Sequence, residues 1–133
     1  MSGLLVNIDV PDIEAGVAFY CGAFGLEVGR RFGPQAVELT GWPARLYLLE
    51  NAAGSPAAGA ERRRYDRHWT PVHLDVVVDD VDAALARALG AGARAETAIR
   101  REAFGRIVTL ADPFGNGLCL IELVGRGYDE IAG

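Results

Sequence analysis

Residues 5–20 read LVNIDVPDIEAGVAFY, and residues 73–88 read HLDVVVDDVDAALARA. When residue 73 is laid over residue 5, both stretches run as an apolar strand, an acidic turn and an amphipathic helix. A second echo lies further along the chain, where LYLLE at 46–50 matches LCLIE at 118–122. A chain that repeats both the opening and the closing of a unit is built from two copies of it. The repeat therefore predicts two modules and directs the search for function to the cavity between them.

The first copy reads as a strand, a helix and three further strands. Pro11 ends the opening strand, Asp12 is a good helix N-cap, and Gly25 stops the helix. The predicted elements are a strand at 4–10, a helix at 12–24, and strands at 26–32, 36–39 and 45–50. This order is a βαβββ unit.

The second copy repeats this order. Its predicted elements are a strand at 72–78, a helix that begins at 81, and strands at about 93–98, 105–110 and 117–124. We therefore expect one domain over residues 1–133, with module 1 at about 4–50, a linker at about 51–69, module 2 at about 70–124, and a C-terminal tail at 125–133. The predicted fold is α+β, with two tandem βαβββ modules that form curved mixed sheets around a cleft.

The two faces of each opening strand differ. One face is uniformly aliphatic, with Leu4, Val6, Ile8 and Val10 in the first copy and Val72, Leu74, Val76 and Val78 in the second. The other face is mixed, because it carries Asn7 and Asp9, or His73 and Asp75. The aliphatic face should pack on the helix of its module. The mixed faces should then line the cleft.

The bulk composition fits an ordinary globular domain. Half of the residues are apolar and the net charge is −5, which argues against broad nucleic-acid binding. No apolar run is long enough to cross a membrane, and nothing at the N-terminus reads as a signal peptide. Two cysteines, Cys21 and Cys119, make no disulfide framework. We expect a cytoplasmic protein with no nucleic-acid or membrane partner.

The paired units, the strand–VPD–helix opening and the closing sequence DPFGNGLCLIEL at 112–123 resemble the vicinal oxygen chelate superfamily. This superfamily includes glyoxalase I, bleomycin-resistance proteins and extradiol dioxygenases. The resemblance covers residues 4–124, and it is closest to small, uncharacterised glyoxalase-like proteins whose last strand carries Cys rather than Glu. It implies the glyoxalase/bleomycin-resistance fold and a single domain of that superfamily.

The resemblance also places the superfamily's metal site. Its enzymes usually hold one divalent metal with residues from the first and last strands of each module. The corresponding positions here are Leu5, Tyr47, His73 and Cys119, and only His73 is a ligand of the expected type. Glu50 and Glu122 fall on the opposite strand faces by alternation. We therefore expect no metal and no other cofactor, with a divalent metal as the alternative.

Six residues are predicted to line the cleft as ligand-binding residues: Asn7, Asp9, Tyr47, His73, Asp75 and Cys119. His73 and Asp75 are also the catalytic candidates, as an acid–base pair, although a structural histidine within the sheet fits the same pattern. Cys119 reads either as a reactive thiol or soft metal ligand, or as a small buried hydrophobe.

Two functions remain open from the sequence. In the first, the protein binds a small organic molecule in the cleft without the metal tetrad, as bleomycin-resistance proteins do. In the second, it is a lyase, isomerase or dioxygenase that uses His73 with a metal, or with Asp75 as an acid–base pair. The fold alone does not choose between them. A homodimer is expected in either case, because units of this fold bury apolar surface by pairing.

Overall fold

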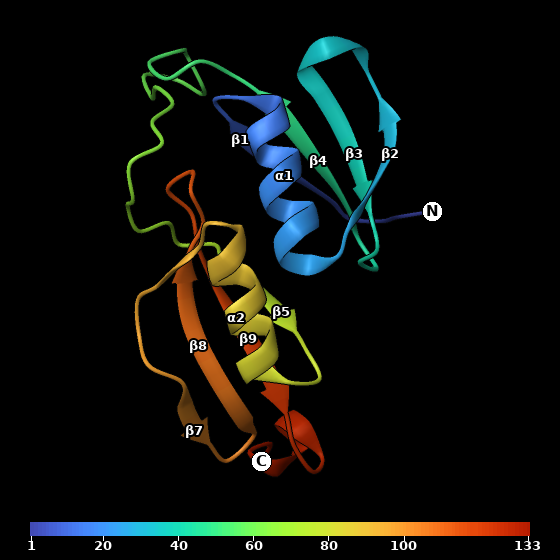
Figure 1. Ribbon diagram of the computed structural model, residues 1–133, viewed down its shortest axis with the longest axis vertical. Helices are drawn as coiled ribbons and strands as arrows, with labels where there is room; N and C mark the ends of the chain where they lie inside the picture. The colour runs from blue at the N-terminus through green and yellow to red at the C-terminus, as the bar shows by residue number, and fades with distance from the viewer. The chain divides into compact units, whose positions relative to one another are not determined.

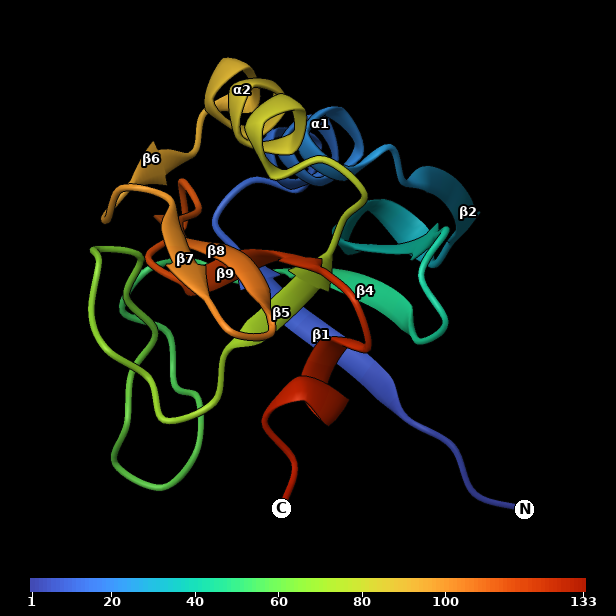
Figure 2. The same cartoon turned by 90° about the horizontal axis from the view of Figure 1, so that it is seen from below.

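Two units, Met1–Asp66 and Arg67–Gly133, make up the computed structural model, which describes residues 1–133 (Figure 1). Each unit consists of one main helix packed against one face of its own mixed sheet (Figure 2). The α+β fold of two βαβββ modules that the repeat predicts is therefore confirmed. No helix of the structure is long and apolar enough to cross a membrane.

The first unit forms a four-stranded sheet in the order β1-β4-β3-β2. Its elements are β1 (Leu5–Val10), α1 (Ile13–Phe24), β2 (Glu27–Arg31), a 3-10 turn (Gly33–Gln35), β3 (Ala36–Thr40) and β4 (Arg45–Glu50). β1 runs parallel to β4, and the other pairs are antiparallel. The opening and closing strands of the unit are therefore neighbours at one end of the sheet.

Helix α1 begins and ends where local chemistry sets its limits. The Asp12 side chain accepts a hydrogen bond from the Ala15 amide at 2.9 Å, and Gly25 closes the helix with a φ of 69°. Gly16 allows the helix to approach the sheet, since a Cβ there would lie 3.0 Å from Val10 and 3.2 Å from Leu48. The aliphatic face of β1 is thus buried at Ile8 and Val10 on the helix side, whereas Leu4 precedes the strand and is exposed, contrary to the prediction.

The second unit repeats this plan with a sheet in the order β5-β9-β8-β6 and with β7 paired to β8. Its elements are β5 (Leu74–Val77), α2 (Val81–Ala91), β6 (Arg94–Ala95), β7 (Arg100–Glu102), β8 (Gly105–Ala111), β9 (Gly117–Leu123) and a 3-10 turn (Gly127–Glu130). β5 is parallel to β9, as β1 is to β4. The opening strand lies beside the closing strand in both units.

One carboxylate plays the same role in each unit. Glu50, at the end of β4, accepts a hydrogen bond from the Ile13 amide at 2.8 Å, and Glu122, near the end of β9, accepts one from the Val81 amide at 3.1 Å. Ile13 and Val81 are the first residues of α1 and α2. Both carboxylates therefore lie on the helix side of their sheets, as strand alternation predicts, and satisfy amides that a helix start leaves open.

Three details of the second unit differ from the prediction. The strand expected at 93–98 forms only over Arg94–Ala95, as β6, and the unpredicted β7 lies beyond it at Arg100–Glu102. The Thr97 hydroxyl accepts a hydrogen bond from the Thr109 amide at 3.1 Å in place of a backbone partner. Val72 lies before β5 and is exposed, so it does not join the aliphatic face. The apolar stripe expected for α2, at Val81, Leu85, Ala88 and Leu89, is buried at Val81 and Ala88, whereas Leu89 is exposed.

The segment after β4, residues 51–66, is held to the first unit by side-chain hydrogen bonds. Its Arg63 side chain donates to Asp9 at 2.8 Å, and the Tyr65 hydroxyl donates to the Asn51 carbonyl at 2.7 Å. Arg67, in the second unit, pairs with Glu96 at 2.7 Å. Arg63 and Arg67 thus both form ion pairs with acidic residues of the protein itself.

Candidate functional site

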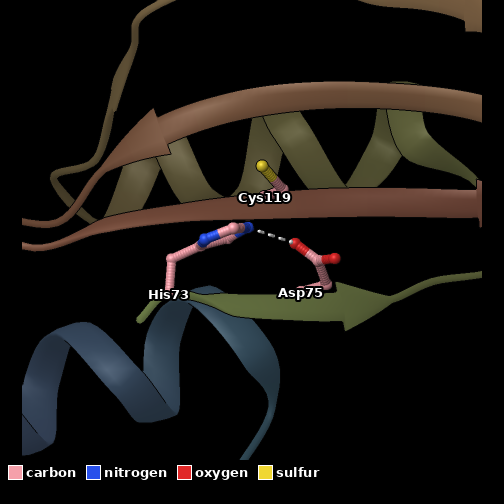
Figure 3. Close-up of side chains that lie close together, drawn as sticks. All are labelled: His73, Asp75 and Cys119. Atoms are coloured by element: carbon pink, nitrogen blue, oxygen red, sulfur yellow. Dashed lines mark ion pairs between the residues drawn. The ribbon is translucent and has the colours of Figure 1, made fainter. Parts of the chain in front are cut away.

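His73 and Asp75 form an open polar pair at the start of β5. Alternation places their side chains on the face opposite Val76, which is buried. The His73 Nε2 atom lies 3.2 Å from an Asp75 carboxylate oxygen, and the two side chains are 39% and 38% exposed. Figure 3 shows the imidazole facing the carboxylate. The pair can donate or accept a hydrogen bond or proton towards a bound molecule.

Cys119 stands next to this pair on the neighbouring strand. It is the register partner of Asp75, and the potential ligand atoms of His73, Asp75 and Cys119 all lie within 4.8 Å of one another (Figure 3). The thiol is within 3.4 Å of the Thr109 hydroxyl. Burial raises the pKa of the Cys119 thiol, and the negative charge of Asp75 acts in the same direction. The thiol is therefore protonated at neutral pH and is not an activated nucleophile.

In the first unit, the predicted residues have different surroundings. Asn7 and Tyr47 are register partners on β1 and β4. The Asp9 carboxylate accepts hydrogen bonds from the Arg63 side chain at 2.8 Å and from the Asn51 side-chain amide at 3.0 Å. Asp9 therefore anchors the segment after β4, a role that local strand alternation could not indicate.

Glu38 is a site residue that the sequence analysis missed. It lies on β3 opposite Tyr47 and is only 3% exposed. Its carboxylate accepts hydrogen bonds from Arg30 at 2.7 and 3.1 Å, from the Tyr47 hydroxyl at 2.9 Å and from Arg45 at 3.3 Å. The hydrogen bonds from Arg30 lower the pKa of Glu38 to about 2. The charged residue within AVELT at 36–40 was the available signal, since alternation places it on the polar face.

A pocket opens beside this network. It has a volume of about 540 Å³ and is lined by residues of the first unit: Gly3, Leu4, Leu5, Pro43, Arg45 and Tyr47. Its lining combines apolar side chains with a guanidinium and a phenol. Such a combination of an apolar wall and a few polar groups is the usual composition of a small-molecule site.

The structure thus places the six predicted ligand residues in two groups. His73, Asp75 and Cys119 converge in the second unit, whereas Asn7 and Tyr47 are neighbours in the first unit, with Asp9 further along β1. That all six line one cavity stays a prediction.

The four positions that the resemblance assigns to a metal carry Leu5, Tyr47, His73 and Cys119. Leu5 has no donor atom, and the Tyr47 hydroxyl donates to Glu38. Cys119 is a buried thiol whose pKa is raised by burial.

The order of two βαβββ units is the architecture of glyoxalase-like proteins, and comparison with known proteins gives the same class. The model of the glyoxalase-like domain matches residues 5–121. Uncharacterized proteins of Mycobacterium bovis and Mycobacterium tuberculosis are each 33% identical over 118 residues, which span 83% of this chain and 76% and 68% of theirs. The chain belongs to the glyoxalase-like domain family, within the vicinal oxygen chelate superfamily.

Solved structures show the same fold. A glyoxalase/bleomycin resistance protein/dioxygenase family enzyme from Burkholderia phytofirmans aligns with a TM-score of 0.70 at 23% identity, over 90% of this chain and 97% of that one. A lactoylglutathione lyase from Agrobacterium tumefaciens aligns with a TM-score of 0.63 at 23% identity, over 92% and 94%. TioX from Micromonospora aligns with a TM-score of 0.69 at 18% identity, over 93% and 100%.

Proposed function

We propose that this protein binds a small organic molecule on the polar sheet faces, without the superfamily's metal tetrad. The observation that carries the proposal is the open His73–Asp75 pair, joined at 3.2 Å on the face of β5 opposite Val76. A polar pair whose side chains both remain more than a third exposed is available to a ligand. The carboxylate orients the imidazole, so that the ring presents a defined hydrogen-bonding edge.

An aromatic side chain beside the pair supports a planar ligand. The ring of Trp69 lies 6.1 Å from that of His73, measured between centroids, and Trp69 is exposed. An exposed indole offers a flat apolar surface, and the imidazole next to it offers a hydrogen bond. A molecule with an aromatic ring and a polar substituent fits both.

A ligand screen tests this proposal. We expect a thermal-shift screen of chelator-treated protein to find planar organic molecules that raise the melting temperature, because a ligand that binds only the folded state stabilises it. For such a ligand, His73→Ala should weaken binding by about fivefold to tenfold, the usual value of one lost hydrogen bond. His68→Ala, which alters the other histidine, is the control. Equal binding by wild type and His73→Ala would remove His73 from the site.

A metal-dependent enzyme is the second candidate, and one observation favours it. The donor atoms of His73, Asp75 and Cys119 lie within 4.8 Å of one another. A borderline metal such as Zn²⁺ accepts this mixture of nitrogen, oxygen and sulfur, although the thiol would first have to lose its proton. Without a metal, His73 and Asp75 could still act as an acid–base pair.

Metal analysis separates the two candidates. We expect protein purified without chelator to contain no stoichiometric divalent metal, because Leu5 and Tyr47 leave the tetrad incomplete. Elemental analysis of wild type, His73→Ala and the control Cys21→Ser measures this. Stoichiometric metal that is kept by Cys21→Ser and lost by His73→Ala would establish the second candidate.

We also propose that the protein is a cytoplasmic homodimer. Free Cys21 and Cys119 support a reducing compartment. Large apolar side chains such as Val28, Val72 and Leu89 are exposed, and a second copy of the chain would cover such surface. Sedimentation velocity should show a dimer at tens of micromolar, on the order of usual assay concentrations. A monomer at that concentration would argue against it.

A further inference from the structure

We infer that the first unit binds the carboxylate group of a small amphiphilic acid through the guanidinium of Arg45. Leu4, Leu5 and Pro43 would hold the apolar body of the molecule in the same pocket. This inference rests on the proposed function, because it names the chemical class of the bound molecule. Its residues all belong to the first unit, so it can be tested separately from His73.

The charge of the site is the first argument. Glu38 is ionised and buried, and Arg30 occupies both of its oxygens with side-chain hydrogen bonds at 3.1 and 2.7 Å. One negative charge is therefore balanced by one arginine. Arg45 is a second cation that pairs with the same carboxylate. The cluster of Arg30, Glu38 and Arg45 therefore carries one positive charge in excess. An anion is the ligand that compensates it.

The availability of Arg45 is the second argument. Its one hydrogen bond in the structure is the contact with Glu38, at 3.3 Å, which is longer than the other side-chain contacts to that carboxylate. The Arg45 side chain is 56% exposed and lines the pocket. A guanidinium has five N–H donors in a planar fork that matches a carboxylate, so most of them are free for a ligand.

The apolar wall is the third argument. Leu4 and Leu5 are exposed large hydrophobic side chains, and they line the same pocket as Arg45. The pocket volume of about 540 Å³ falls within the range of small-molecule sites. The Tyr47 hydroxyl donates its one hydrogen bond to Glu38 at 2.9 Å, so Arg45 supplies the free donors at the polar end. The pocket therefore suits a molecule with a charged head and an apolar body.

A matched pair of probes tests the charge of the ligand. Titration of labelled protein with 4-phenylbutyrate and with 4-phenylbutyramide, followed by amide NMR, compares an acid with its neutral isostere. We expect the acid to bind about tenfold more tightly, as one charge-assisted hydrogen bond provides. The shifted amides should belong to residues 3–5 and 45–47. Arg45→Gln should abolish the preference, whereas the control Arg31→Gln, at the end of β2 and paired with Glu14, should keep it.

A salt titration of wild type tests the same idea without a substitution. The preference for the acid should decrease when NaCl rises from about 0.02 M to about 0.5 M, because an exposed guanidinium is screened. The inference is overturned if acid and amide bind equally, if neither shifts residues 3–5 and 45–47, or if Arg45→Gln retains the preference. Ligands that depend on His73 and leave these residues unshifted would overturn it while the proposed function stands. If the acid is preferred but no ligand depends on His73, the role of His73 in the proposed function is overturned while this inference stands.

Discussion

Gly105→Ala is expected to disrupt the second unit. A Cβ at Gly105 would lie 1.9 Å from the Glu122 carbonyl oxygen and 2.9 Å from its carbon, and the φ of 153° is itself unfavourable for alanine. The atoms in the way are backbone atoms of β9, so no side-chain rotation relieves the clash. We expect a loss of at least about 3 kcal/mol in the free energy of unfolding. Urea denaturation followed by circular dichroism measures it.

The same substitution elsewhere provides the control. Gly90 lies within α2, and a Cβ there would have no atom within 4 Å. Gly90→Ala should therefore stabilise the protein by about 0.5–1 kcal/mol, the usual difference between glycine and alanine inside a helix. If Gly105→Ala were as stable as wild type, the close approach of β8 and β9 would be wrong.

Glu38→Gln is expected to remove a pH-dependent part of the stability. The hydrogen bonds from Arg30 lower the pKa of Glu38 from 4.5 to about 2 in the folded protein, so the folded state binds this proton less readily than the unfolded state. The contribution of Glu38 is therefore complete above pH 4.5 and is lost as the pH falls towards 2. The glutamine variant is isosteric but uncharged, so its melting temperature should be lower than that of wild type at neutral pH. The difference should narrow in acid.

Thermal melts at about pH 7 and about pH 3 measure this difference. Glu14→Gln is the control, because Glu14 is exposed and pairs with Arg31 at the surface. An exposed pair of this kind contributes little to stability. If Glu38→Gln followed wild type at both pH values, the carboxylate would not be held by Arg30, Arg45 and Tyr47 as the structure has it.

Much of the fold could be predicted because local patterns determine it. The first unit's β4 has the predicted bounds, Arg45–Glu50, since an apolar alternation runs between two clear turns. Alternation also separated Glu50 from Tyr47, and the two residues do serve opposite faces. The shortening of the strand expected at 93–98 escaped prediction, because the Thr97 hydroxyl and not a backbone carbonyl pairs with the Thr109 amide.

The site was harder to predict, because its contacts join residues that are distant in sequence. His73 and Asp75 are two residues apart in a strand, so alternation alone predicts that their side chains share one face, and the two do pair there. Arg63 meets Asp9 across 54 positions of sequence, and Glu38 becomes buried through side chains from two neighbouring strands. No periodicity within one element indicates which long side chain will bend towards which carboxylate.

The carboxylates that join each closing strand to its own helix have a consequence for how the two units can differ in sequence. Glu50 accepts a hydrogen bond from Ile13 and Glu122 accepts one from Val81, each within its own unit. These contacts lie on the helix sides of the sheets and constrain the residues there. The opposite sides are free of this constraint, and Leu5 stands in one unit where His73 stands in the other.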